Sequence, residues 1–394
     1  IKKMVRIKSI VGNNFSGKTC ILRLDLNIPL SEDGEILDDT RILESIPTID
    51  YLINQSAKVI IISHIGRPKG KFNKNYSFKP LIQDISKRIN REIFFIEHKN
   101  QSKISTILDS QPSGTLFLLD NVRFNDGEEN SNPDFIDFLS SFSDVFINDG
   151  FGTIHRNHSS ITGITNKLPS FGGILLEKEI INITECISAK SSNSTAILGG
   201  SKISDKIPII ENLSNNFEKV IITGGMIRPF LIARDKLKQK NISEIKEEIF
   251  YAEKILQKHS QIYVPEQLVC SENINEEPII LHSSQINDSD LIFDIGPNSI
   301  DDIGKMILES DKIIWNGPPG VYENKNFSNG TKKLINFIVN SKSKLKVAGG
   351  GSTVASINYY KASDYFSHIS TGGGAFLRLL EGKFLEGIEV LKDE

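Results

Sequence analysis

Short apolar runs recur along the chain, and most of them are continuous rather than alternating with polar residues. Five lie in the first half, at residues 20–27, 57–63, 92–97, 115–120 and 144–148. Six lie in the second half, at residues 195–199, 219–223, 261–264, 291–295, 311–315 and 344–348. A continuous apolar run is typical of a strand that is covered on both faces of its sheet. The pattern therefore predicts two series of largely buried strands.

Stretches of helical length separate these runs, for example residues 41–56 and 247–260. Strands that alternate with helices in this way predict an α/β fold with parallel sheets. The strands are too many for one compact sheet, so we expect two doubly wound domains. Residues 176–189 have apolar positions at helical spacing and precede a polar stretch at 190–194, which predicts a helix that connects the two domains.

Composition excludes several classes of protein. The 394 residues carry 46 basic and 49 acidic side chains, a net charge of -3, which argues against nucleic acid as a partner. Three cysteines without a CxxC pair favour neither a zinc site nor a disulfide framework, and they suit a reducing compartment. No apolar run approaches the ~18 residues of a membrane span, and the first residues lack a signal-peptide pattern. We expect a soluble cytoplasmic protein without a membrane partner.

Basic side chains gather where the strands of the first half end. In an open parallel sheet, ligands bind beyond the carboxyl ends of the strands. The residues at these ends are Asp25, Asn27, His64, Arg67, Arg123, His155 and Arg156, with Arg41 just beyond the first strand. A single arginine is usually a solvated surface residue, so the coincidence of several carries the argument. Guanidinium and imidazole groups together suit a small, highly charged phosphate or carboxylate ligand.

Glycines gather where the strands of the second half end. The segments are LGGSK (198–202), TGGM (223–226), DIGP (294–297), WNGPPG (315–320), AGGGST (348–353) and STGGG (370–374). One glycine after a strand more often serves a turn, but runs of glycine let the backbone approach a polyphosphate at helix N-termini. Lys202 and Lys206 follow one such turn, and their spacing predicts that both lie on one face of the next helix. The two kinds of site together predict phosphate transfer between a small acid and a nucleotide.

Residues 12–19, GNNFSGKT, fit the pattern of a phosphate-binding P-loop. That motif requires a helix immediately after it, whereas the alternating residues and the proline that follow predict a strand. We expect a turn here, and a P-loop NTPase that uses Lys18 is the alternative from another class. The glycine runs are not GxGxxG fingerprints, which disfavours NAD binding.

Eight segments, in this order, resemble the signatures of the phosphoglycerate kinase family, and the match runs along essentially the whole chain. They are RLDLNIPL (23–30), DDTRI (38–42), SHIGRPKG (63–70), NVRF (121–124), NDGFGTIHRNHSS (148–160), LGGSKISDKI (198–207), WNGPPGVYE (315–323) and HISTGGGA (368–375). The resemblance implies two Rossmann-like domains: a phosphoglycerate-binding domain at 1–172 and a nucleotide-binding domain at 191–375. It also implies a hinge helix and linker at 173–190, a tail at 376–394 that packs on the first domain, and a monomer.

The resemblance implies an activity and a set of site residues. The reaction is reversible, direct in-line phosphoryl transfer from 1,3-bisphosphoglycerate to ADP after hinge closure, giving 3-phosphoglycerate and ATP with Mg²⁺ in glycolysis or gluconeogenesis. Asp25, Asn27, Arg41, His64, Arg67, Arg123 and Arg156 would bind phosphoglycerate. Gly200, Ser201, Lys206, Gly224, Gly225, Asn316, Pro318, Glu323, Gly350, Gly351, Ser352 and Thr353 would bind nucleotide. Arg41, Lys202, Gly350 and Gly373 would act in catalysis.

One position departs from the family pattern. The family's GGGD[ST] loop carries an aspartate that contacts the nucleotide-bound magnesium, and this chain has Ser352 there. A hydroxyl is a weaker ligand than a carboxylate for this cation. The departure motivates a second alternative, a catalytically impaired relative that is retained as a binding or structural protein. Arg41, Lys202 and Lys206 argue against it.

Overall fold

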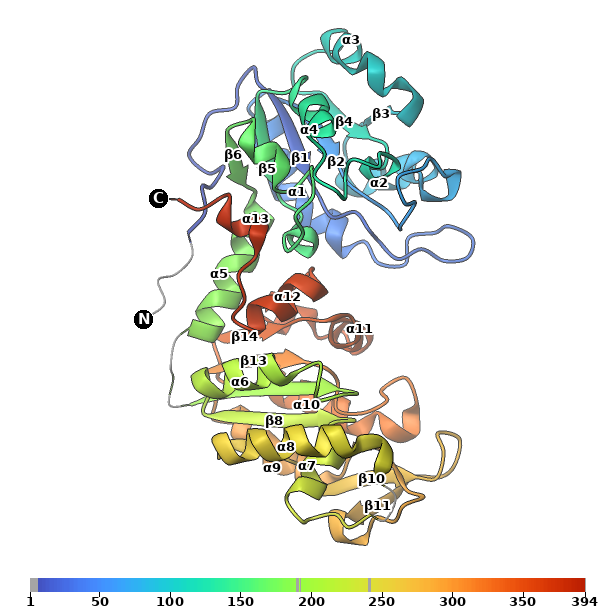
Figure 1. Cartoon of the computed structure of the whole chain (residues 1–394), viewed down its shortest axis with the longest axis vertical. Coiled ribbons are helices and arrows are strands. Elements are labelled where there is room, and N and C mark those ends of the chain that lie inside the picture. The colour runs from blue at the N-terminus through green and yellow to red at the C-terminus, as the bar shows by residue number, and fades with distance from the viewer. Residues whose placement is uncertain (1–5, 189–190, 192, 240–241, 394) are drawn as a thin grey trace. The chain divides into compact units, whose positions relative to one another are not determined.

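The computed structural model describes residues 6–188, 191, 193–239 and 242–393. They divide into two compact units (Figure 1). One unit contains the residues up to Ile181 together with those from Phe384 onward, and the other contains Asn182–Lys383. The division falls inside helix α5 (Ile174–Ser188), which coincides with the apolar stretch expected to form a connecting helix.

The first unit is built on a sheet of six parallel strands in the order β3-β4-β2-β1-β5-β6. Its strands are β1 (Thr19–Arg23), β2 (Lys58–Ile62), β3 (Phe94–Ile96), β4 (Leu116–Leu119), β5 (Val145–Asn148) and β6 (Ser170–Gly172). Its helices are α1 (Thr40–Ile53), α2 (Ile82–Ile89), α3 (Ile104–Asp109), α4 (Pro133–Ser140) and α13 (Glu386–Glu389).

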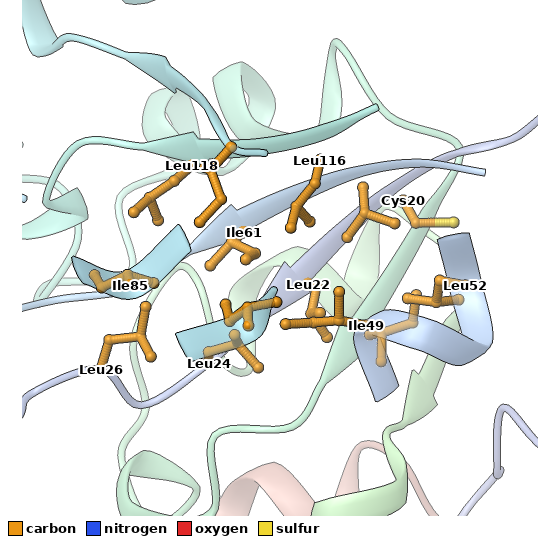
Figure 2. Close-up of a cluster of buried hydrophobic side chains, with 14 of the residues drawn as sticks. Cys20, Leu22, Leu24, Leu26, Ile49, Leu52, Ile61, Ile85, Leu116 and Leu118 are labelled. Atoms are coloured by element: carbon orange, nitrogen blue, oxygen red, sulfur yellow. The ribbon is translucent and has the colours of Figure 1, made fainter. Parts of the chain in front are cut away.

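Both faces of this sheet are buried, as the continuous apolar runs predict. Successive residues of a strand point to opposite faces. Leu22 and Ile61 pack on one face with Ile49 and Leu52 of α1 and Ile85 of α2 (Figure 2). The residues next to them in β1 and β2, Ile21 and Ile60, belong to a second cluster with apolar residues of α3 and α4. The sheet is therefore covered by helices on two sides, which is a doubly wound arrangement.

The second unit contains another six-stranded parallel sheet, in the order β15-β14-β13-β7-β8-β9. Its strands are β7 (Ser194–Gly200), β8 (Lys219–Gly224), β9 (Ile262–Tyr263), β13 (Lys312–Asn316), β14 (Leu345–Ala348) and β15 (His368–Ile369). Its further helices are α6 (Ile207–Asn216), α7 (Ile227–Ala233), α8 (Lys246–Lys258), α9 (Pro297–Leu308), α10 (Asn329–Asn340), α11 (Gly351–Tyr359) and α12 (Gly373–Leu380). The expected α/β fold with two parallel sheets is confirmed.

A small antiparallel sheet is inserted in the second unit, and the apolar pattern did not predict it. Its strands are β10 (Gln267–Ser271), β11 (Ile279–His282) and β12 (Leu291–Ile295), in the order β11-β10-β12. Residues 291–295 form a strand as expected, but this strand lies outside the parallel sheets. Leu291 is 42% exposed, because only part of β12 is covered.

The P-loop interpretation of residues 12–19 fails its structural requirement. The motif leads into strand β1, and the next helix among the described residues is α1, which begins only at Thr40. Gly12 and Gly17 have φ angles of 86° and 70°, which are typical of glycine in turns.

Among all the residues that the structure describes, no helix has both the length and the apolar character needed to cross a membrane.

Asp294 at the end of β12 provides a test of the packing in the second unit. Its Oδ2 accepts the Gly330 N–H at 2.7 Å, and its buried Oδ1 has no hydrogen-bond partner among the described residues. Burial raises the pKa of this carboxyl to about 7, compared with about 3.9 in an unfolded chain. Between these two values the folded protein binds one more proton than the unfolded chain. This group's contribution to stability is therefore lost as the pH rises from about 4 to about 7.

The Asp294→Asn variant should not lose stability in this way as the pH rises, because its side chain no longer ionises. We expect the free energy of unfolding, measured with urea, to fall less between pH 5 and pH 8 in the variant than in the wild type. Asp149, whose pKa burial also raises to about 7, contributes equally to both proteins and cancels. The same pH dependence in both proteins would contradict this account of Asp294.

Candidate active site

The carboxyl edge of the first unit's sheet carries a connected set of polar groups. Arg41 Nη1 lies 3.1 Å from Asp25 Oδ2 and donates to the carbonyl oxygen of Asn27 at 2.8 Å. The Asn27 side chain in turn accepts the N–H of Gly66 at 2.9 Å. Arg123 Nη1 donates to the Gly66 carbonyl oxygen at 3.0 Å. These bonds link the loops that follow β1, β2 and β4 with the start of α1, so residues distant in sequence share one edge.

Burial gives this cluster its charge properties. His64 is 2% exposed, and burial, followed by the charges of Arg23 and Arg123, holds its pKa well below 6.5. The imidazole is therefore neutral at pH 7. Burial also lowers the pKa of Arg123 to about 10, which leaves this guanidinium charged, and its Nη2 is buried with no hydrogen-bond partner in the described chain. Arg123 Nε lies 3.2 Å from Glu129 Oε1, and the buried Nη2 N–H groups that remain suit an anionic oxygen from a ligand.

The remaining candidates of this unit are more open to solvent. Arg67 is exposed, and Arg156 is half-buried in the loop after β5. Arg156 and Arg41 both contribute to the low pKa of His64, which indicates that their charges act on the same region. His155 is also half-buried beside Arg156.

Sequence reasoning missed Arg23 and Glu128 in this cluster. Arg23 is fully buried at the end of β1, and its Nη2 lies 3.3 Å from Nδ1 of His64. Glu128 is also fully buried. Arg23 stands inside an apolar strand pattern and Glu128 inside a polar loop, so neither was recognised as a buried charge.

A pocket of about 510 Å³ lies in the second unit, at the carboxyl edge of its parallel sheet. Strand β7 has β13 on one side and β8 on the other, so the chain changes direction across the sheet at β7. Ligands bind at such switch points in open α/β sheets. The predicted residues that line the pocket are Gly200, Ser201, Lys202, Lys206, Gly224, Gly225, Asn316, Pro318, Gly350, Gly351, Ser352 and Thr353.

Glycine is required where the backbones around this pocket approach each other. A Cβ atom on Gly199 would lie 2.8 Å from the Gly317 backbone, and one on Gly317 would lie 2.5 Å from the Gly199 backbone. Gly350, at the N-terminus of α11, has a φ angle of 98°, and a Cβ there would lie 2.4 Å from Asn316 Nδ2. The segments after β7, β13 and β14 can therefore meet only without side chains at these positions.

Hydrogen bonds fix the polar groups in the pocket. Lys206 Nζ donates to Asn316 Oδ1 at 2.7 Å, and Asn316 Nδ2 donates to the Gly349 carbonyl oxygen at 2.7 Å. Gly317 N donates to the Thr353 hydroxyl at 2.7 Å. Burial lowers the pKa of Lys206 from its ordinary value. The ammonium is thus held beside the N-terminus of α11, where backbone N–H groups favour an anion.

The structure places some of the predicted residues of this unit differently from the expectation. Lys202 and Lys206 do not lie on one face of a helix, because α6 begins only at Ile207, with Pro208 in its first turn. Both lysines belong instead to the turn before α6, and both line the pocket. Glu323 and Gly373 do not appear among the lining residues; Glu323 is exposed beside Tyr322, and Gly373 begins α12.

Sequence reasoning also missed the apolar part of the pocket and one carboxylate. Ile292, Phe293, Val321 and Leu377 line the pocket, and so does Asp205. Ile292 and Phe293 belong to β12 and are only partly buried, since the antiparallel sheet leaves part of this strand uncovered. The apolar side chains suit the flat face of a nucleotide's base, while the glycines and lysines suit the phosphates of the nucleotide.

Comparison with known proteins identifies the family of this chain. The family model described as phosphoglycerate kinase matches residues 10–383. The chain belongs to the phosphoglycerate kinase family. Phosphoglycerate kinase from Borreliella afzelii is 39% identical over 386 residues, which cover 96% of this chain and 98% of the relative. Phosphoglycerate kinase from Fervidobacterium nodosum is 36% identical over 390 residues, which cover 97% of each chain.

Solved structures of phosphoglycerate kinases share the fold. The structure from Coxiella burnetii has a TM-score of 0.87 and 32% sequence identity, and the match covers 98% of this chain and 99% of that one. The structure from Pyrococcus horikoshii has a TM-score of 0.83 with 30% identity, and covers 98% of each chain. Membership of the phosphoglycerate kinase family makes the chain a phosphotransferase with a two-domain, Rossmann-like fold.

Proposed function

We propose that this chain transfers a phosphoryl group reversibly between 1,3-bisphosphoglycerate and ADP, giving 3-phosphoglycerate and ATP. The observation that carries the proposal is the pairing of two different sites in a chain of this family. One is the arginine-rich cluster of the first unit, which contains Arg23, Arg41, Arg67, Arg123 and Arg156. The other is the glycine-rich pocket of the second unit, which is also lined by Lys202 and Lys206. The candidate residues belong to separate units, so the units have to bring their ligands together during turnover.

Phosphoglycerate binds in the first unit through charge and hydrogen bonds. Arg67, Arg123 and Arg156 hold the phosphate and carboxylate oxygens, since the planar guanidinium group matches both. The buried N–H of Arg123 without a partner supports this role. Asp25 and Asn27 orient Arg41, and neutral His64 contributes a ring nitrogen without adding charge.

The nucleotide binds in the second unit with its phosphates at the N-terminus of α11. Lys206 pairs with these phosphates, and the glycine backbone of residues 350–351 approaches them closely. Phe293 and Val321 cover the base. This assignment is supported by the pocket lining and by the hydrogen bonds that hold Lys206 at its edge.

The chemical step needs positioning and charge neutralisation. An oxygen of the ADP β-phosphate attacks the acyl phosphate, the bond between phosphorus and the carboxyl oxygen breaks, and the carboxylate leaves with its electron pair. Arg41 and Lys202 neutralise the negative charge on the phosphoryl group in flight. No general base is needed, because in the reverse direction the attacking carboxylate is already ionised at pH 7. Water must be excluded during this step, since it could accept the phosphoryl group.

The residues around the pocket fit a magnesium ion that is held mainly by the nucleotide. Magnesium typically binds through one or two carboxylates together with substrate phosphates and water. Asp205 and the Ser352 hydroxyl line the pocket and would hold the ion on the protein side. Across the described chain, no group of three or more His, Cys, Asp or Glu side chains could form a metal cage. When bound, magnesium supplies charge neutralisation at the phosphates.

Ser352→Asp should strengthen the binding of magnesium to the protein–ADP complex, because a carboxylate replaces a neutral hydroxyl beside the phosphates. A charge-assisted contact of about 1.5 kcal/mol corresponds to roughly a tenfold lower dissociation constant for the ion. The measurement is a calorimetric titration of the complex with Mg²⁺. Ser352→Asn is the matched neutral control, and equal magnesium affinity in the aspartate variant and this control would refute the prediction.

The proposed activity is tested by coupled measurement of ATP formation by the purified chain. Sustained ATP production that requires both 1,3-bisphosphoglycerate and ADP is the expected result. Binding of both substrates without ATP production would support the alternative of an impaired relative that is retained as a binding protein.

A further inference from the structure

Glu128 is a buried charge whose role none of the steps above explains. The residue lies in the loop after β4, five positions beyond Arg123, and its side chain is 0% exposed. A buried carboxylate is costly unless hydrogen bonds and opposite charges compensate it. Its contacts therefore indicate which part of the molecule depends on it.

Four hydrogen bonds join the Glu128 segment to the loop after β5. The carboxylate accepts the Ser160 hydroxyl at 2.5 Å and the Ser160 N–H at 3.0 Å. The Glu128 carbonyl oxygen accepts the Ser159 N–H at 2.9 Å, and the Gly127 carbonyl oxygen accepts the Ser159 hydroxyl at 2.8 Å. These bonds fasten two loops to each other, and the loops carry Arg123 and Arg156.

The opposite charges near Glu128 are guanidinium groups. Among the nearby charges, that of Glu128 raises the pKa of buried Arg23 most. It also raises the pKa of Arg123, but less than Glu129 does, whose Oε1 lies 3.2 Å from Arg123 Nε. His158 Nδ1 lies 3.8 Å from Glu128 Oε1, but burial and nearby arginines lower the pKa of this histidine to about 4. The imidazole is therefore neutral at pH 7. The charge of Glu128 therefore acts on guanidiniums of the arginine-rich cluster, since the neutral His158 offers it no opposite charge.

We propose that Glu128 is a positioning residue for the phosphoglycerate site. By accepting hydrogen bonds from Ser160, it holds the loop that contains Arg156 against the loop that contains Arg123. It thereby sets the distance between the two guanidinium groups that bind the phosphoglycerate. This inference rests on the proposed function. It also differs from a purely electrostatic role: removing a negative charge from beside the arginines would by itself strengthen anion binding, whereas loss of positioning weakens it.

The test compares Glu128→Gln and Ser160→Ala with the wild type in steady-state kinetics of ATP consumption. Ser160→Ala removes one bond of this connection and keeps the charge. Hydrogen bonds to charged groups are strong enough that we expect about a tenfold higher KM for 3-phosphoglycerate in each variant. The KM for ATP and kcat should stay within about twofold of the wild type, because the second unit is untouched.

Ser310→Ala is the matched control for a buried serine. Ser310 lies in the second unit and is 3% exposed, and its hydroxyl is 2.7 Å from Thr195 Oγ1. Loss of this hydroxyl should lower stability without changing the KM for 3-phosphoglycerate. An unchanged or lower KM for 3-phosphoglycerate in Ser160→Ala would overturn the inference. If Glu128→Gln does not fold, Ser160→Ala decides alone. A wild-type chain without activity would instead refute the proposed function.

Discussion

Arg41→Ala is expected to lower kcat by at least about two orders of magnitude, the largest effect of any single change in the first unit. A cation that stabilises a phosphoryl group in flight contributes on the order of 3 kcal/mol or more to the barrier. Arg41 is well placed for this role, because its contacts with Asp25 and the Asn27 carbonyl oxygen hold the guanidinium at the carboxyl edge of the sheet. Steady-state assays with saturating substrates measure the effect.

Two further variants make this prediction specific. Arg41→Lys keeps the positive charge but loses the planar guanidinium group, which can donate two parallel hydrogen bonds. We therefore expect it to retain only part of the wild-type activity. Arg91→Ala is the matched control, since Arg91 belongs to the same unit and forms an ion pair with Asp50 at 2.7 Å. If Arg41→Ala lowered kcat no more than Arg91→Ala does, the role assigned to Arg41 would be wrong.

Lys206→Ala is expected to weaken ADP binding by about a hundredfold. The ammonium is held in the pocket by Asn316, so it is already positioned for a phosphate and loses little freedom on binding. The loss of a partly desolvated charged contact of roughly 3 kcal/mol corresponds to that factor. Calorimetric titration with ADP measures it directly, without requiring turnover.

Lys18→Ala separates this account from the P-loop alternative. Lys18 lies in the turn before β1, in the other unit, and its removal should leave ADP affinity unchanged. Loss of ADP binding in Lys18→Ala with retention in Lys206→Ala would reverse the assignment of the nucleotide site.

Much of the fold could be predicted from the sequence, because both faces of each parallel sheet are buried. Under that condition each strand becomes a continuous apolar run, and every one of the runs named above contains a strand. The antiparallel insertion was not predicted because its partly exposed strand β12 has the same apolar pattern as a buried one. The prediction that Lys202 and Lys206 share one face of a helix is wrong, because the helix after the glycine turn starts only at Ile207.

The candidate site was predictable where its residues follow strands, and less so where burial decides their role. Arg123 and Lys206 were found because sheet topology brings the ends of parallel strands together. Arg23 was missed because a charge within an apolar run gives no sign of its burial. The pairing of Glu128 with Ser160 joins residues 32 positions apart, and local sequence pattern carries no signal for such a contact.

The central claim is direct transfer of a phosphoryl group between two bound substrates, with no protein nucleophile. A single-turnover experiment tests it most directly, using excess enzyme and 1,3-bisphosphoglycerate labelled with ³²P in the acyl phosphate. The account predicts that the label remains in 1,3-bisphosphoglycerate until ADP is added, and then appears in ATP as fast as the acyl phosphate disappears. Label bound covalently to the protein, or released as inorganic phosphate in place of ATP, would contradict it.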